Sequence, residues 1–262
     1  MKKTFIISVL SFFSLIIIQI TLSFTLGYVL FEILNIKEKE SLKFVVQLSI
    51  DISLIIVIFS LIYYLKIQFK DSFKIPTDKS ILVTILLAIL IVLISPLIDL
   101  ITFFKTLRDN YIAFCLPNTN KVLTIDYFLL RIIIIGPILE EIYFRGIIQK
   151  ILSKKIKPFV AILISSLLFS LGHLDFNQFL SFFLIGLIIG TLYYKTNNLL
   201  LVIILHVVAN LLITFTKDKY IYLEGINNMF IFVYPIVLTL IYLILKKTFL
   251  LRNSFLFPFL FK

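Results

Sequence analysis

The sequence predicts an all-α membrane protein, a polytopic bundle of about eight transmembrane helices. Apolar residues make up 61% of the 262 residues, and only 15% are charged, whereas soluble proteins average about 25% charged residues. Several apolar runs exceed the length of about 20 residues that a helix needs to cross a bilayer. No run alternates with period two, so helices are the only spanning structure we expect.

We expect a single transmembrane domain over residues 1–262, in which a core over about residues 127–216 carries the motifs described below. The first apolar run is too long for a signal peptide and has no small-residue cleavage site, so we expect an uncleaved first span. Prolines within spans, at Pro96, Pro137 and Pro235, predict kinks. The expected spans cover about residues 5–31, 44–65, 80–104, 127–149, 158–174, 178–194, 199–216 and 229–246.

The net charge of +11 comes from basic residues in short loops between apolar runs. This placement suits membrane orientation and anionic lipid headgroups, and no basic-aromatic surface motif supports nucleic-acid binding. Lys and Arg are more numerous in the loops on the side of both termini, which predicts a multi-pass cell-membrane protein with cytoplasmic termini. The single cysteine, Cys115, excludes an intramolecular disulfide and a multi-cysteine metal site.

Three charged residues interrupt the fourth apolar segment, at Glu140, Glu141 and Arg145. Each would cost about 2.5–3.5 kcal/mol if it faced lipid alone, so partners are required. Glu141 and Arg145 stand four residues apart on one helix face and are expected to form an ion pair. Glu140 points about 100° away and has no partner in its own segment. We therefore expect Glu140 to line a polar site that residues of other spans complete.

The chain contains two histidines, His173 and His206, and both fall within expected spans. A lone intramembrane histidine commonly forms a hydrogen bond between helices. However, His206 and Asn210 share a helix face and would present an imidazole and an amide to the same point. We expect the two histidines to complete the site of Glu140, and Arg131 to be a packing or interfacial residue.

Three motifs, taken in order, resemble the CPBP family of CAAX proteases and bacteriocin-processing proteins, also called the Abi family. They are E-E-x-x-x-R from Glu140 to Arg145, F-x-x-x-H from Phe169 to His173, and H-x-x-x-N from His206 to Asn210. The N-terminal half matches only as hydrophobic spans. The resemblance implies an eight-helix intramembrane endopeptidase, similar in plan to the type II CAAX prenyl endopeptidases.

The resemblance also implies roles for these residues. Glu140 and His173 would activate a water molecule, and His206 with Asn210 would stabilise the oxyanion. The family is often described as metalloproteases, and Glu140, His173 and His206 could form a zinc shell with one open position. The chain has no H-E-x-x-H pairing on one helix. We favour metal-free activation of water, with zinc as the alternative.

The expected activity is hydrolysis of a peptide bond, in a peptide or protein substrate that is lipidated or membrane-bound. The resemblance implies prenylated CAAX peptides, bacteriocin leaders or pheromone-like peptides as substrates. One alternative is a non-catalytic membrane scaffold or bacteriocin self-immunity protein that keeps the motif residues for packing. A proton or ion transporter is a further alternative, although the repeated halves and paired broken helices typical of transporters are absent from the sequence.

Overall fold

The computed structural model describes residues 2–33, 39–70, 72–101, 127–176 and 178–221, and residue 239. All regular structure in these ranges is helical, without a strand, which confirms the all-α prediction for this part of the chain. The elements are α1 (Lys2–Tyr28), η1 (Val29–Ile33), α2 (Lys39–Leu65), α3 (Asp78–Ile101), α5 (Tyr127–Leu130), η2 (Arg131–Ile135), α6 (Gly136–Glu141), η3 (Ile142–Gln149), α7 (Lys150–Ser153), α8 (Pro158–Gly172), α9 (Phe179–Thr196) and α10 (Leu199–Ile221), where η marks a π-helix.

Helices occupy all the expected spans that fall in the described ranges, whereas the expected span 229–246 lies outside them. Within the described residues, three helices are long and apolar enough to cross a membrane, over Ile6–Tyr28, Phe44–Leu65 and Phe179–Thr196. Two shorter apolar helices cover Pro158–Gly172 and Leu199–Thr214. These features identify a helical membrane protein, while the number of eight spans stays a prediction.

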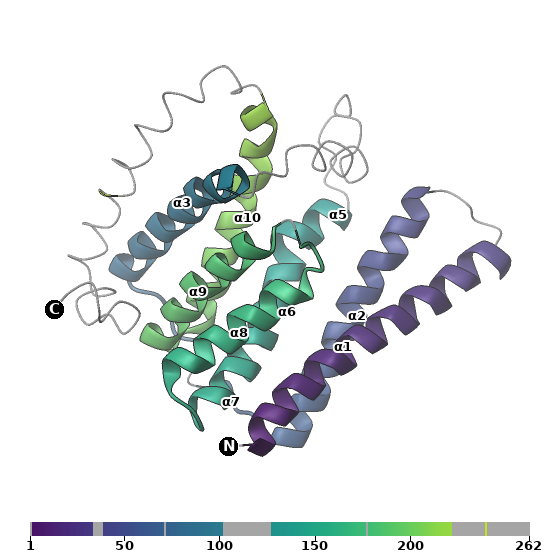
Figure 1. The fold of residues 1–262 in the computed structure, drawn as a ribbon, viewed down its shortest axis with the longest axis horizontal. Coiled ribbons are helices and arrows are strands. Elements are labelled where there is room, and N and C mark those ends of the chain that lie inside the picture. Colours follow the sequence, from purple (N-terminus) through teal and green to yellow (C-terminus); the bar gives the residue numbers. More distant parts are fainter. Residues whose placement is uncertain are drawn as a thin grey trace.

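The helices pack as pairs around the segment from α5 to α7. Helices α1 and α2 form one antiparallel pair, α8 packs along α9, and α3 packs along α10. Figure 1 shows α6 at the centre of the bundle, with α1 and α2 on one side and α3, α9 and α10 on the other. The segment that carries the two glutamates therefore has neighbours in most directions.

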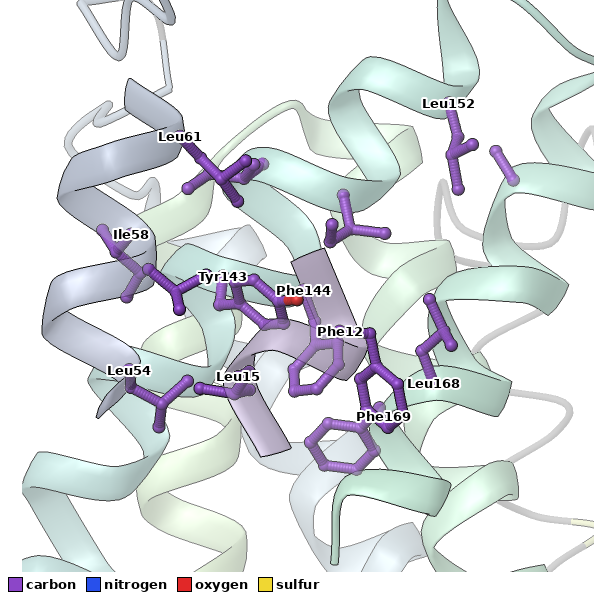
Figure 2. Close-up of a cluster of buried hydrophobic side chains, with 14 residues drawn as sticks. Phe12, Leu15, Leu54, Ile58, Leu61, Tyr143, Phe144, Leu152, Leu168 and Phe169 are labelled. Carbon is purple, nitrogen blue, oxygen red and sulfur yellow. The ribbon is translucent and has the colours of Figure 1, made fainter. Parts of the chain in front are cut away.

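Two clusters of buried apolar side chains lie on either side of this central segment. The first cluster joins α3, α9 and α10, and Ile138 and Ile142 of the central segment pack against it. The second joins α1, α2, η3 and α8, and Tyr143 and Phe144 belong to it. Figure 2 shows Phe144 beside Phe12 and Phe169 in this second cluster. The central segment thus contributes apolar side chains to both cores and holds its charged residues between them.

Small residues allow the close approach of α8 and α9. A Cβ atom added to Gly186 would lie 3.0 Å from Cβ and 3.1 Å from Cα of Ser166. A Cβ atom added to Gly190 would lie 2.9 Å from Oε1 of Gln149 and 3.2 Å from Cγ2 of Ile162. Helix association in lipid depends on such contacts, because burial of apolar surface drives it only weakly there. Gly186 and Gly190 therefore set the distance of α9 from α8 and from η3.

The central segment stays helical through Pro137, where the sequence predicted a kink. A π-helical turn precedes this proline, and the N–H of Gly136 donates to the carbonyl of Arg131. A second π-helix, η3, begins directly after Glu141. Wide turns of this kind occur frequently at functional sites because they rotate the following side chains relative to a regular helix.

Candidate active site

Glu140 and His173 face each other at the end of α8. Atom Oε2 of Glu140 lies 4.0 Å from Nε2 of His173, and the two side chains are 18% and 24% exposed. His173 directly follows α8, and Leu174 after it adopts a left-handed backbone with φ of 53°. A left-handed non-glycine residue is strained, and such residues cluster at functional sites. The turn at Leu174 ends the helix and leaves His173 at its tip.

Two contacts fix the imidazole of His173. Its Nδ1 atom lies 2.8 Å from the carbonyl oxygen of Phe169, one helical turn earlier. Its ring stacks on Phe182 of α9, with centroids 4.0 Å apart and an interplanar angle of 23°. Because a carbonyl only accepts hydrogen bonds, Nδ1 carries the proton and Nε2 of the neutral ring is an acceptor. The acceptor nitrogen of His173 therefore points at the carboxylate of Glu140.

The distance between Glu140 and His173 suits a bridging water molecule. A separation of 4.0 Å is too long for a direct hydrogen bond. One water oxygen can lie at about 2.8 Å from both atoms across such a gap. Both protein atoms are acceptors, so they would bind the two hydrogens of that water and leave its lone pairs free. This is the arrangement that a general base needs to produce a nucleophilic hydroxide.

Glu141 is completely buried and connects two helices. Its Oε2 atom lies 3.2 Å from Nε of Arg145, which is also completely buried. Its Oε1 atom lies 2.8 Å from Nδ1 of His206 on α10. The predicted ion pair between Glu141 and Arg145 is confirmed. The contact with Arg145 is an ion pair, whereas the contact with His206 is a hydrogen bond. Because a carboxylate accepts that hydrogen bond, Nδ1 of His206 carries a proton.

His173 lies beside Glu140 as expected, whereas the carboxylate hydrogen-bonded to His206 is that of Glu141. Successive residues on a helix point about 100° apart, so Glu140 and Glu141 face different neighbours. Glu140 faces the end of α8, and Glu141 faces α10. The site therefore contains two carboxylate–imidazole pairs.

Phe169 lies among the charged groups of both pairs. Its ring centroid is 4.5 Å from Cζ of Arg145, 4.6 Å from the ring of His173 and 5.8 Å from that of His206. A cation over an aromatic face is stabilised by the ring quadrupole, most strongly away from water. Phe169 thus separates the two histidines and helps to hold the guanidinium of Arg145.

Helix α9 contributes residues that sequence analysis did not identify. The carbonyl oxygen of Gly186 accepts from Nη2 of Arg145 at 3.3 Å, and that of Gly190 accepts from Nε2 of Gln149 at 2.7 Å. Phe182, one turn before Gly186, stacks on His173. The Gly-x-x-x-Gly spacing from 186 to 190 could have indicated this close helix contact. No local pattern distinguishes Phe182 from the other phenylalanines.

Asn210 lies on α10 one turn after His206, as predicted. Its Nδ2 atom donates to the carbonyl oxygen of Ile132 at 2.9 Å, within the π-helix η2. An amide nitrogen has two hydrogens, so a second donor remains. His206 is bonded to Glu141 through Nδ1, so its other ring nitrogen, Nε2, makes no contact with Glu141. Asn210 therefore keeps one amide N–H, whereas Nε2 of the neutral His206 ring is an acceptor and donates only when the ring carries a second proton.

The three proposed zinc ligands do not fit a zinc site as they are placed. Tetrahedral coordination with bonds of about 2.0–2.1 Å would bring two ligand atoms to about 3.4 Å from each other. The atoms of Glu140 and His173 are 4.0 Å apart, and His206 pairs with Glu141. Within the described ranges no three His, Cys, Asp or Glu side chains form a group that could hold a metal ion.

Comparison with known proteins shows that this region is similar to one family of membrane endopeptidases. Residues 123–212 match the family described as "Type II CAAX prenyl endopeptidase Rce1-like". The match includes all three motifs and every helix that contributes to the site. It confirms the resemblance that the motifs predicted, for about a third of the chain. The chain is therefore a helical membrane protein whose central region is similar to the Rce1-like family.

Two curated relatives match with similar identity. The "Membrane-embedded CAAX protease MroQ" of Staphylococcus aureus is 36% identical over 104 residues, which cover 36% of this chain and 42% of MroQ. The "Putative membrane peptidase YdiL" of Bacillus subtilis is 36% identical over 95 residues, which cover 36% of this chain and 37% of YdiL. The chain thus matches less than half the length of either relative. No solved structure matches.

Proposed function

We propose that this protein is an intramembrane endopeptidase in which Glu140 and His173 activate a water molecule for attack on a peptide bond. The observation that carries the proposal is the pair of acceptor atoms 4.0 Å apart, which leaves room for one water between a carboxylate and an imidazole. The similarity to a CAAX protease and to a family of prenyl endopeptidases supports the same activity.

In the proposed reaction the water transfers a proton to Glu140 or His173 and attacks the carbonyl carbon. The tetrahedral intermediate then collapses with cleavage of the C–N bond, and the proton taken up by Glu140 or His173 passes to the leaving amine nitrogen. The developing oxyanion would accept from Nε2–H of His206, when that imidazole is doubly protonated, and from the second N–H of Asn210. Such donors commonly supply the largest single contribution to acyl-transfer catalysis. Glu141 and Arg145 would hold His206 in place. No step of this mechanism involves a metal ion.

The proposal places the protein in the cell membrane as a multi-pass, single-domain bundle over residues 1–262, with both termini in the cytoplasm. Its partners would be the lipid bilayer and a peptide or protein substrate that is lipidated or membrane-bound. The similarity to CAAX-processing enzymes supports a substrate that is cleaved at or near the membrane. Bacteriocin self-immunity is a further proposed role of the same site.

The test compares peptides from membranes of cells that carry wild type, Glu140→Gln or Glu32→Gln. Glu32 is an exposed glutamate in η1 and provides a matched control. We expect Glu140→Gln to reduce cleavage of the wild-type substrate by about 10²- to 10⁴-fold, the usual contribution of a general base. Glu32→Gln should retain wild-type cleavage. Equal peptide profiles for wild type and Glu140→Gln, at equal protein levels, would overturn the proposal.

A further inference from the structure

A second buried charge cluster lies outside the residues assigned above. Nε of Arg131 lies 3.1 Å from Oδ1 of Asp51 on α2, and the side chains are 11% and 5% exposed. The hydroxyl of Tyr127 donates to Oδ2 of Asp51 at 2.7 Å. Asp51 thus uses both oxygens, one for each partner. The three residues join α2 to the start of the central segment.

Asp51 leaves most of the guanidinium of Arg131 unused. An arginine has five N–H donors, and a carboxylate commonly binds two of them side by side. Because Tyr127 occupies the second oxygen of Asp51, the contact in the structure is through Nε alone. Within the described residues, Nη1 and Nη2 of Arg131 make no hydrogen bond. Neither atom belongs to the fully buried polar atoms without a partner, so both remain accessible.

An arginine with unused donors is costly inside a membrane protein. Unsatisfied polar groups are avoided at membrane depth unless they line a cavity with water or a ligand. Asp51 balances the charge of Arg131 while its Nη1 and Nη2 atoms stay available. These two nitrogens form the planar fork that recognises carboxylates. The donor set therefore fits one anionic group with two oxygens.

Arg131 lies within reach of the proposed catalytic residues. It precedes Glu140 by nine residues in the same helical segment, or about 13 Å along the axis. Arg131 is near enough to Glu140 for the two charges to attract each other. An extended peptide advances about 3.3–3.6 Å per residue. A carboxylate held by Arg131 would thus belong to a substrate position on the order of two to four residues from the bond at Glu140.

We propose that Arg131, held by Asp51 and Tyr127, binds a carboxylate of the peptide substrate and thereby selects the bond that is cleaved. This inference rests on the proposed peptidase function and adds a specificity residue to it. The carboxylate is either the C-terminal group of the peptide or an Asp or Glu side chain. Both sources share the same chemistry, and the experiment separates them.

The probe is a membrane peptide that disappears from cells carrying wild type but persists in cells without the protein, synthesised in three forms. One form has a free C-terminal carboxylate, one has a C-terminal carboxamide, and one has its acidic side chains replaced by the corresponding amides. Each form is labelled with fluorescein. Cleavage is measured with active protein, and the Kd is measured with the Glu140→Gln variant, which separates binding from catalysis.

We expect wild type to cleave one of the two amide forms about 10- to 100-fold less efficiently than the free acid, mainly through KM, because a charge-assisted contact is lost. The amide form that is cleaved less efficiently identifies the source of the carboxylate, C-terminal or side-chain. Arg131→Gln should remove this discrimination. The double variant Asp51→Asn/Arg131→Gln should do the same without leaving a buried unpaired carboxylate. Lys154→Gln, which removes an exposed cation elsewhere, should keep the wild-type preference.

Equal Kd values for all three forms would overturn the inference, as would an unchanged preference in both Arg131 variants. Failure of the peptidase function has a different signature. In that case cleavage would not depend on Glu140, while discrimination in binding between the acid and amide forms would still depend on Arg131.

Discussion

Nδ1 of His206 lies 2.8 Å from Oε1 of Glu141, so a carboxylate of the central segment fixes the imidazole of another helix. The other oxygen of Glu141 lies 3.2 Å from Nε of Arg145. The carbonyl of Gly186 accepts from the same guanidinium. A continuous chain of polar contacts thus runs from α9 through η3 and α6 to α10. It holds His206 while Glu140 stays available beside His173.

Replacing Glu141 by glutamine should destabilise the protein. The substitution keeps the shape but leaves Arg145, which is completely buried, without a carboxylate. Breaking a buried ion pair typically costs about 3–5 kcal/mol. We expect a loss of this size in the free energy of unfolding, measured by denaturant titration in detergent micelles, together with lower cleavage because His206 is no longer fixed by a charge.

The double variant Glu141→Gln/Arg145→Met is the control for this prediction. It removes both charges, and neutral replacement of a buried pair is often tolerated. We therefore expect it to recover stability relative to Glu141→Gln while cleavage stays low. If the single variant unfolds at the same denaturant concentration as wild type, the ion pair does not contribute as proposed.

The sequence predicted those features of the site that depend on one helix alone. The ion pair of Glu141 and Arg145 follows from their spacing of four residues, and the shared face of His206 and Asn210 follows in the same way. The partner of His206 could not be predicted, because it depends on which side of α6 meets α10. That choice is made by packing between segments distant in the sequence.

The stacking of Phe182 on His173 could not be predicted from the sequence either. The chain contains 28 phenylalanines, and most positions in an apolar span suit this residue. Its stacking on His173 depends on how α9 lies against the end of α8. By contrast, the spacing of Gly186 and Gly190 is a recognisable pattern of close helix packing. It indicates a contact but not the partner helix.

Replacing Phe182 by leucine should lower cleavage with little loss of stability. The substitution removes the ring that stacks on His173 at 4.0 Å and lets the imidazole rotate away from Glu140. Aromatic pairs contribute about 0.5–1.5 kcal/mol, which corresponds to a decrease in kcat/KM of about 2- to 12-fold. Phe182→Tyr, which keeps the ring, should remain close to wild type.

Phe183 supplies the matched control, since its ring stacks on Phe179 and not on a histidine. Phe183→Leu should leave kcat/KM within about twofold of wild type. A comparable decrease in both leucine variants would indicate a general packing effect of α9 and would contradict a specific role for the stack on His173.

Chelation should leave the activity intact. The separation of 4.0 Å between Glu140 and His173 suits a water molecule better than two zinc ligands, and His206 pairs with Glu141. Purified protein dialysed against a strong zinc chelator should retain its cleavage rate, and elemental analysis should find less than stoichiometric zinc. Loss of cleavage on chelation, with recovery on added zinc, would show that these residues rearrange around a metal.

Alanine in place of Gly186 should be the most damaging of three glycine substitutions. Its Cβ would lie 3.1 Å from the backbone Cα of Ser166, which cannot move aside as a flexible side chain can. Overpacking of this kind costs about 1–3 kcal/mol. Gly190→Ala should cost less, because its nearest contact is the end of the Gln149 side chain at 2.9 Å.

Gly27 in α1 completes the series, since a Cβ atom there would meet nothing within 4 Å. Gly27→Ala should be neutral or slightly stabilising because alanine favours the helix. The expected order of unfolding free energies is Gly27→Ala above Gly190→Ala above Gly186→Ala, measured in one detergent. Cleavage should fall in the same order, because a displaced Gly186 carbonyl releases Arg145 and with it Glu141 and His206. A Gly186→Ala protein as stable and active as wild type would mean that α9 does not anchor the site.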